Sequence, residues 1–145
     1  MAIRTSHGGY RLAPDGPGWR LELAATYTNR TGRTVHLDGG GGMHPAFVLE
    51  KLQGDAWVPA FAPVSLLMAA PPLEVAPGAS RTDTLVLLAS RPGLGAPAFT
   101  VDSVPGTYRL VYAAYASSTV ESRAARLSDP LPVEACSSNP FRVEW

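Results

Sequence analysis

The chain has 145 residues, a length that fits one domain with a hydrophobic core of its own. Its 12 basic and 12 acidic residues cancel and are scattered, so the charge pattern favours neither nucleic acid nor an anionic membrane as a partner. The single cysteine, Cys136, excludes an internal disulfide, and no apolar stretch approaches the roughly 18 residues that a membrane span requires.

Residues 1–18 are polar and rich in turn-forming residues. We expect either a loosely ordered segment or an edge strand around Tyr10-Arg11-Leu12. Met1 is not followed by an apolar run of signal-peptide length. The compartment stays open: the sequence as written predicts a cytoplasmic protein, and an extracytoplasmic one if a signal peptide has been removed.

The first long strand is predicted over residues 19–29, where apolar and polar side chains alternate. A period of two residues places successive side chains on opposite faces of a sheet. The following Asn29-Arg30-Thr31-Gly32 predicts a hairpin turn into a strand over residues 34–37. The apolar face of the first strand consists of Trp19, Leu21, Leu23, Ala25 and Tyr27.

The middle of the chain alternates turn signals with short strands. Four glycines at residues 39–42 interrupt regular structure before a strand predicted over residues 46–52. Gly54-Asp55 closes that strand ahead of a short segment at Trp57-Val58. Five prolines within residues 59–79 exclude a long helix or a central strand there.

Large apolar side chains lie within this proline-rich stretch. If they are exposed, such a patch marks a surface for a partner or ligand. If they fold back, they cap one end of the fold, and each large side chain then contributes roughly 1.5–3 kcal/mol by burial. The residues concerned, which are the candidate binding residues of the sequence, are Phe61, Val64, Leu66, Leu67 and Met68.

The second half of the chain continues the pattern. Strands are predicted over residues 82–89, 99–101 and 107–115, and Pro105-Gly106 forms the turn before the last of them. Residues 117–132 are expected to form a polar loop, and residues 133–135 and 139–145 to close the fold. One face of the 107–115 strand carries Tyr108, Leu110, Tyr112 and Ala114.

Short strands, turn signals about every 8–12 residues and the absence of helical periodicity together define the fold class. They predict an all-β, immunoglobulin-like antiparallel β-sandwich of about seven to eight strands. Trp19, Trp57 and Tyr108 are its expected structural residues. No linker or internal repeat divides the sequence, so residues 1–145 are predicted to form a single domain.

The order of these features resembles a bacterial immunoglobulin-like domain. An early strand that begins at Trp19 is followed by Gly54-Asp55-Ala56-Trp57, Pro77-Gly78 and Pro105-Gly106-Thr107-Tyr108. Over residues 19–116 this order is similar to the bacterial intracellular proteinase inhibitor domain family. The resemblance implies a sandwich with a tyrosine corner, in which the Tyr108 hydroxyl bonds back to upstream backbone, and it suggests inhibition of a protease.

One cluster of residues has the composition of a metal site. His36 and Asp38 share one face of a predicted strand, and His44 follows the four glycines. Two imidazoles and a carboxylate suit zinc or a similar ion with one open position. The alternative is that all three are solvated polar residues beside a glycine-rich loop.

The sequence carries no signature of catalysis. Cys136 has no neighbouring histidine and is expected to be a small buried apolar residue, and residues 39–42 lack the following Lys-Ser/Thr of a phosphate-binding loop. We therefore expect no cofactor, and a non-catalytic binding or accessory module that contacts another protein through loops or an edge strand. The alternatives are a protease inhibitor that uses residues 61–68, and a metal-binding protein or enzyme centred on His36 and His44. The sequence predicts no oligomeric state.

Overall fold

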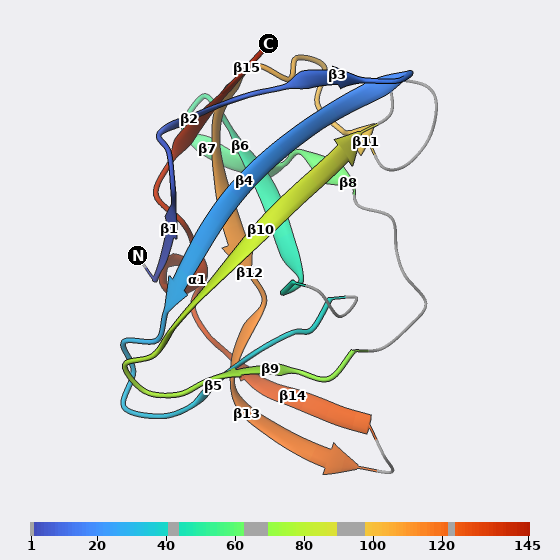
Figure 1. Ribbon diagram of the computed structural model, residues 1–145. Helices are drawn as coiled ribbons and strands as arrows, with labels where there is room; N and C mark the ends of the chain where they lie inside the picture. The colour runs from blue at the N-terminus through green and yellow to red at the C-terminus, as the bar shows by residue number, and fades with distance from the viewer. Residues whose placement is uncertain (1, 41–43, 63–69, 90–97, 122–123) are drawn as a thin grey trace.

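The computed structural model describes residues 2–40, 44–62, 70–89, 98–121 and 124–145. Within these ranges the chain is almost entirely β-structure arranged in several open sheets (Figure 1), which confirms the all-β prediction. The helical part of the described chain is one turn, α1 (Val133–Cys136). No helix in the described ranges is long and apolar enough to cross a membrane.

The first sheet is built on two long strands, β4 (Gly18–Thr28) and β10 (Ser80–Ala89), which pair antiparallel along their whole length. The short strands β1 (Ile3–Thr5) and β3 (Ala13–Asp15) pair with the other side of β4. The predicted alternation in residues 19–29 is confirmed, because Leu21, Leu23, Ala25 and Tyr27 are buried.

The second sheet has five strands in the order β2-β15-β12-β6-β7. Their bounds are β2 (Gly9–Arg11), β15 (Phe141–Glu144), β12 (Gly106–Tyr112), β6 (Phe47–Gln53) and β7 (Ala56–Pro59). All pairs are antiparallel except β2 with β15, which is parallel. The N-terminal segment thus contributes β1 to the first sheet and β2 to the second.

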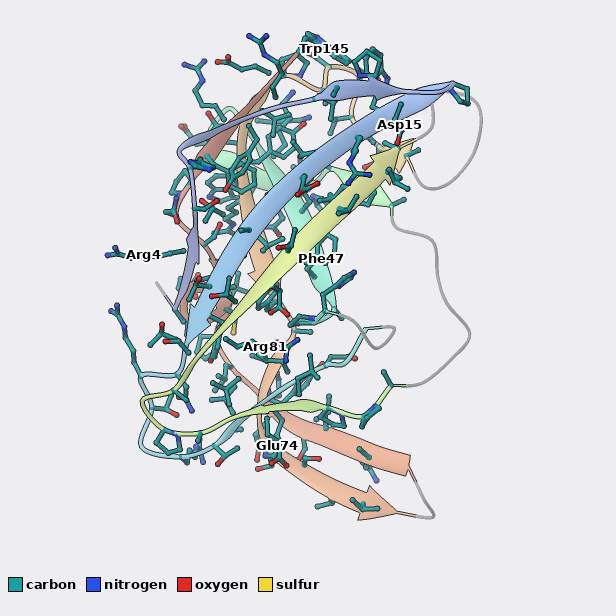
Figure 2. All side chains as sticks on the ribbon, in the orientation of Figure 1. Arg4, Asp15, Phe47, Glu74, Arg81 and Trp145 are labelled. Carbon is teal, nitrogen blue, oxygen red and sulfur yellow. The ribbon has the colours of Figure 1, made fainter. Side chains whose placement is uncertain are left out.

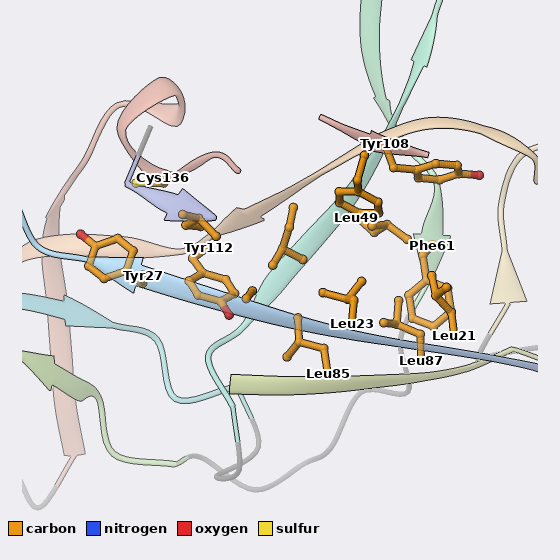
Figure 3. Packing of buried hydrophobic residues seen from close by; sticks show 14 of the residues in the cluster. Leu21, Leu23, Tyr27, Leu49, Phe61, Leu85, Leu87, Tyr108, Tyr112 and Cys136 are labelled. Carbon is orange, nitrogen blue, oxygen red and sulfur yellow. The ribbon is translucent and has the colours of Figure 1, made fainter. Parts of the chain in front are cut away.

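The core lies where these two sheets face each other (Figure 3). Tyr27 of the first sheet and Tyr112 of the second are in ring contact, with centroids 6.4 Å apart. Burial of each large apolar side chain contributes roughly 1.5–3 kcal/mol, so this shared layer is the main stabilising element. Its largest fully buried residues include Leu21, Leu23, Leu85 and Leu87 from one sheet, and Leu49, Tyr108, Leu110 and Phe141 from the other.

A third sheet has the order β14-β13-β5-β9 and lies at the end of the molecule opposite the C-terminus (Figure 1). It contains β5 (Val35–Leu37), β9 (Leu73–Val75), β13 (Ala114–Glu121) and β14 (Ala124–Pro130). The polar loop predicted over residues 117–132 is therefore wrong, because most of it forms the β13–β14 hairpin. Among its described side chains, residues 115–120 and 125–130 are half-buried or exposed and none is buried, so the hairpin lacks the apolar alternation that identifies a half-buried strand.

The hairpin turn predicted at residues 29–32 is also wrong. β4 and β5 do not pair with each other but belong to different sheets. The reason is Asn29, whose fully buried amide donates to the carbonyls of Arg33 and Val75, both at 2.8 Å, while its Oδ1 accepts from the backbone N–H and hydroxyl of Thr31. The side chain thereby fixes the chain where it passes from one sheet to the next.

The segment before β12 is held from two sides. The Tyr108 hydroxyl donates to the Val104 carbonyl, four residues upstream, as a tyrosine corner requires. The Lys51 ammonium donates to the Ser103 carbonyl. Gly106 lies beside this lysine with a φ of 154°, a backbone conformation that other residues rarely adopt.

Candidate functional site

Phe61, the first residue of the predicted apolar binding stretch, belongs to the core. It lies in β8 (Phe61–Ala62), which pairs with β11 (Ala98–Phe99), and its ring contacts that of Phe99 at 5.4 Å between centroids. Only 9% of Phe61 is exposed, so at this residue the structure favours the cap over the exposed surface. Val64, Leu66, Leu67 and Met68 lie outside the described residues.

The structure does not bring the predicted metal ligands together. No group of three or more His, Cys, Asp or Glu side chains suited to a metal occurs among the described residues, which include His36, Asp38 and His44. Instead His36 Nδ1 lies 3.7 Å from Glu74 Oε1, Asp38 Oδ1 accepts the Gly40 N–H, and His44 Nδ1 lies 3.0 Å from the Pro45 carbonyl. Alternation along the strand predicts that His36 and Asp38 share a face. It does not predict which groups the imidazole and the carboxylate contact.

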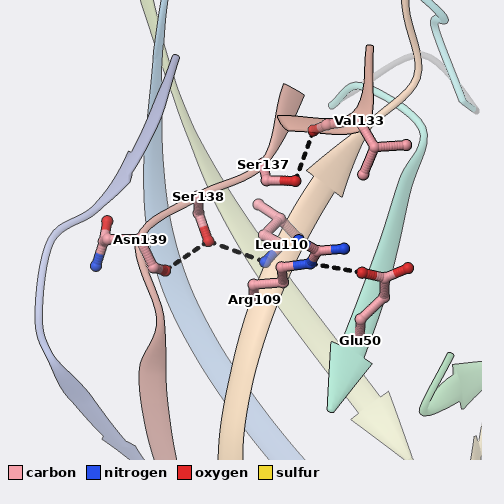
Figure 4. A network of polar contacts seen from close by, with 7 residues as sticks. All are labelled: Glu50, Arg109, Leu110, Val133, Ser137, Ser138 and Asn139. Carbon is pink, nitrogen blue, oxygen red and sulfur yellow. Dashed lines mark hydrogen bonds and ion pairs between the residues drawn. The ribbon is translucent and has the colours of Figure 1, made fainter. Parts of the chain in front are cut away.

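Trp57 and Arg109 occupy the outer face of the five-stranded sheet. The Arg109 guanidinium carbon lies 4.7 Å from the centre of the Trp57 ring, and its Nε donates to Glu50 Oε2 at 2.6 Å (Figure 4). Both charged side chains are only 17% exposed. The pair is thus already satisfied within the sheet and presents no free charge for a ligand.

The polar groups buried near the core include the Cys136 thiol, the Asp83 carboxylate and the Tyr112 hydroxyl. Burial raises the pKa of the Cys136 thiol to about 11, which keeps it protonated and unreactive at neutral pH. Asp83 is buried but accepts two hydrogen bonds from Arg81, which is labelled in Figure 2. Burial likewise raises the pKa of Tyr112, whose hydroxyl has no partner among the described residues.

The feature with most potential for recognition is the free edge of β10. Among the described strands β10 pairs with β4 alone, and its register runs from Ser80 to Ala89 without a bulge. Val86 and Leu88 are 41% and 46% exposed on its outer face. Sheet edges usually carry devices that block pairing, such as short strands, prolines or charges, and residues 84–89 have none of these.

The other sheet edges in the described chain differ in this respect. β1, β2, β3 and β9 each have three residues, and β7 has four and ends at Pro59. β14 is longer, with seven residues, but it carries Arg126 and Asp129, and Asp129 has a positive φ of 58° that interrupts extended backbone. β10 also carries Arg81 and Asp83, but these pair with each other near its start, and its last six residues, 84–89, form a long uncharged edge that distinguishes it from these strands.

The hydrogen bonds at the start of β10 show which of its backbone N–H and C=O groups point toward β4 and which point to the free edge. The Asn29 N–H donates to the Ala79 carbonyl, so odd-numbered residues of this strand direct N–H and C=O toward β4. Even-numbered residues then direct theirs away from β4. They are Ser80, Thr82, Thr84, Val86 and Leu88, the same residues whose side chains line the outer face.

The sequence predicted this strand but not its position at an edge, because pairing partners are set by the long-range topology. A comparison of the sequence with protein-family models found no match, and a search of curated proteins also found none. The geometry of β10 is thus the observation from which a function can be argued.

Proposed function

We propose that this chain is a non-catalytic binding module of immunoglobulin-like architecture, and that it binds an extended segment of another protein along the free edge of β10. The observation that carries the proposal is that β10 pairs on one side only, without a bulge, and has no charged residue from Thr84 to Ala89. An added strand would receive main-chain hydrogen bonds from the even-numbered residues, and main-chain bonding of this kind supplies affinity in strand addition.

Strand order supports the immunoglobulin-like part of the proposal. In chain order, β1, β4 and β10 correspond to strands A, B and E of such a sandwich, and β6, β12 and β15 to strands C, F and G. The Tyr108–Val104 hydrogen bond occupies the place of the tyrosine corner near the start of strand F. The third sheet is an addition to that plan.

The outer face beside the edge suggests the chemistry of the partner. Thr82, Thr84, Val86 and Leu88 are uncharged, and Thr82 is bonded to Thr26 on the neighbouring strand at 2.7 Å. A partner strand that places small polar and β-branched apolar side chains on this face would match it, whereas a charged one would lose solvation without gaining an ion pair.

Protease inhibition by residues 61–68 has less support. An inhibitory loop of this kind must present its side chains to the protease, and Phe61 is packed against Phe99 instead. We therefore place recognition at β10 and not at this stretch.

A matched pair of lysine substitutions tests the proposal. Thr84 and Ala24 are cross-strand neighbours in the register, so Thr84→Lys and Ala24→Lys add the same charge at the same level, one on the edge strand and one on the inner strand. Linear peptides are first selected from a random library for binding to the wild type. Their affinity for Thr84→Lys should be about tenfold or more lower than for the wild type, because an edge lysine opposes strand addition. Affinity for Ala24→Lys should stay within about threefold of the wild type.

Isothermal calorimetry with the selected peptides measures these affinities, and far-UV circular dichroism verifies that both variants are folded. Peptides that bind Thr84→Lys as tightly as the wild type would place recognition elsewhere and refute the proposal. Sedimentation of both variants measures whether the chain self-associates. This control is needed because two copies of the chain that pair through β10 would compete with the peptide.

A further inference from the structure

An aromatic crevice at the C-terminal end of the molecule lies outside the β10 edge. It has a volume of about 240 Å³ and opens near Trp145, which is labelled at the top of Figure 2. The two sheets meet here, since Trp19 is the second residue of β4 in the first sheet and Trp145 follows β15 of the second. The lining residues are Trp19, Phe99, Val101, Asp102, Ser103, Val104, Pro105 and Trp145.

The aromatic walls form a corner and not a flat platform. The ring centroids of Trp19 and Trp145 are 4.7 Å apart and their planes are inclined by 55°. Trp145 is 53% exposed, although an indole of this size is usually covered. At this distance the two indoles touch, so a ligand can reach only the parts of their faces that diverge from the contact, and the negative π-surface there attracts a cation.

The lining of the crevice also includes a carboxylate, that of Asp102. Asp102 lines it and is exposed, and no ion pair of Asp102 occurs in the part of the chain that the structure describes. Lys51, which holds this segment through the Ser103 carbonyl, is not among the lining residues. Among the described lining residues the charge is therefore negative, which complements a cation.

The third wall is rigid before any ligand arrives. Tyr108 bonds to Val104 and Lys51 to Ser103, and Phe99 packs against Tyr108 with centroids 6.3 Å apart. A wall fixed in advance lowers the entropic cost of binding.

We propose that this crevice binds a small organic cation, of the quaternary-ammonium class, against the exposed parts of the Trp19 and Trp145 rings with Asp102 as the counter-charge. This site is independent of the β10 edge, since it uses none of the residues from which strand addition was argued.

Choline and its neutral isostere 3,3-dimethyl-1-butanol test the proposal, because they share shape but differ in charge. The three tryptophan indole N–H signals in the NMR spectrum, assigned with Trp57→Phe, provide the readout and an internal control. Choline should shift the Trp19 and Trp145 signals saturably, with Kd on the order of 1–30 mM, and leave Trp57 unmoved. The isostere should bind about 3- to 30-fold more weakly.

Two variants separate the contributions. Asp102→Asn, at an exposed position, should weaken choline about threefold and leave the isostere unchanged. Trp145→Leu should remove the preference for the cation, so that the two compounds differ by less than about twofold. Equal affinity of choline and the isostere in the wild type, tighter binding of neutral glucose, or shifts confined to Trp57 would each overturn the proposal.

Discussion

Raising the pH from 9 to 12 is expected to unfold the protein cooperatively. Burial raises the pKa of Tyr27 from 10.0 to about 12, with a smaller contribution from Cys136, and it raises that of Cys136 from 9.0 to about 11. Burial also raises the pKa values of Tyr108 and Tyr112. All four groups therefore stay protonated in the folded chain at a pH at which the unfolded chain has already lost those protons.

The sign of the effect follows from linkage. Each group's contribution is fully present below its unfolded pKa and is lost as the pH rises through the folded value. At about 1.4 kcal/mol per pKa unit, Tyr27 and Cys136 together remove about 5 kcal/mol of unfolding free energy, which is as much as many domains have in total.

Absorbance at 295 nm, which reports tyrosinate, should rise in a step that coincides with the loss of far-UV circular dichroism. Cys136→Ala combined with Tyr27→Phe should move that step to higher pH, because two of the four ionising groups are gone. Complete ionisation of the five tyrosines with an unchanged dichroism spectrum would contradict the expectation.

Substitution of Asn29 is expected to destabilise the fold strongly. Asn29→Ala leaves the carbonyls of Arg33 and Val75 and the Thr31 N–H without this partner, and we expect a loss of about 3 kcal/mol. Asn29→Asp is nearly isosteric but replaces the donating amide with an oxygen that faces both carbonyls. We expect it to cost about 4–5 kcal/mol at neutral pH, more than alanine does.

Guanidinium chloride unfolding measures both losses. Thr31→Val is the control, since it removes one hydroxyl that bonds to Asn29 Oδ1 from a more exposed position, and it should cost about 1 kcal/mol. If Asn29→Asp proved no worse than Asn29→Ala, the two carbonyl contacts would not be what fixes the passage between the sheets.

Strands with one buried face were predictable from the sequence. Buried side chains alternate with more exposed ones from Leu21 to Tyr27 and from Tyr108 to Ala114, because each strand has the core on one side. The order of residues within each strand is enough to predict this. The β13–β14 hairpin was not predicted, because a hairpin without a buried face has no alternation of apolar and polar residues in its sequence. At Asn29 the local signal was misleading, since an Asn-Arg-Thr-Gly turn looks the same whether the chain returns to its own sheet or enters another.

The candidate sites were harder to predict, for a related reason. His36, Asp38 and His44 are close in sequence, but strand pairing and loop geometry give each a different partner. The β10 edge and the Trp19–Trp145 crevice depend on which strands are neighbours and on where the two ends of the chain meet. Both are long-range properties that residue spacing does not encode.

Amide hydrogen exchange along β10, measured by NMR on the free protein at low concentration, tests the central claim most directly. If the edge is open, the amides of Thr84 and Val86 face solvent while those of Leu85 and Leu87 are bonded to β4. We therefore expect Thr84 and Val86 to exchange about tenfold or more faster than Leu85 and Leu87. Equal protection of all four amides would mean that the edge is already covered, and strand addition at β10 would then be excluded.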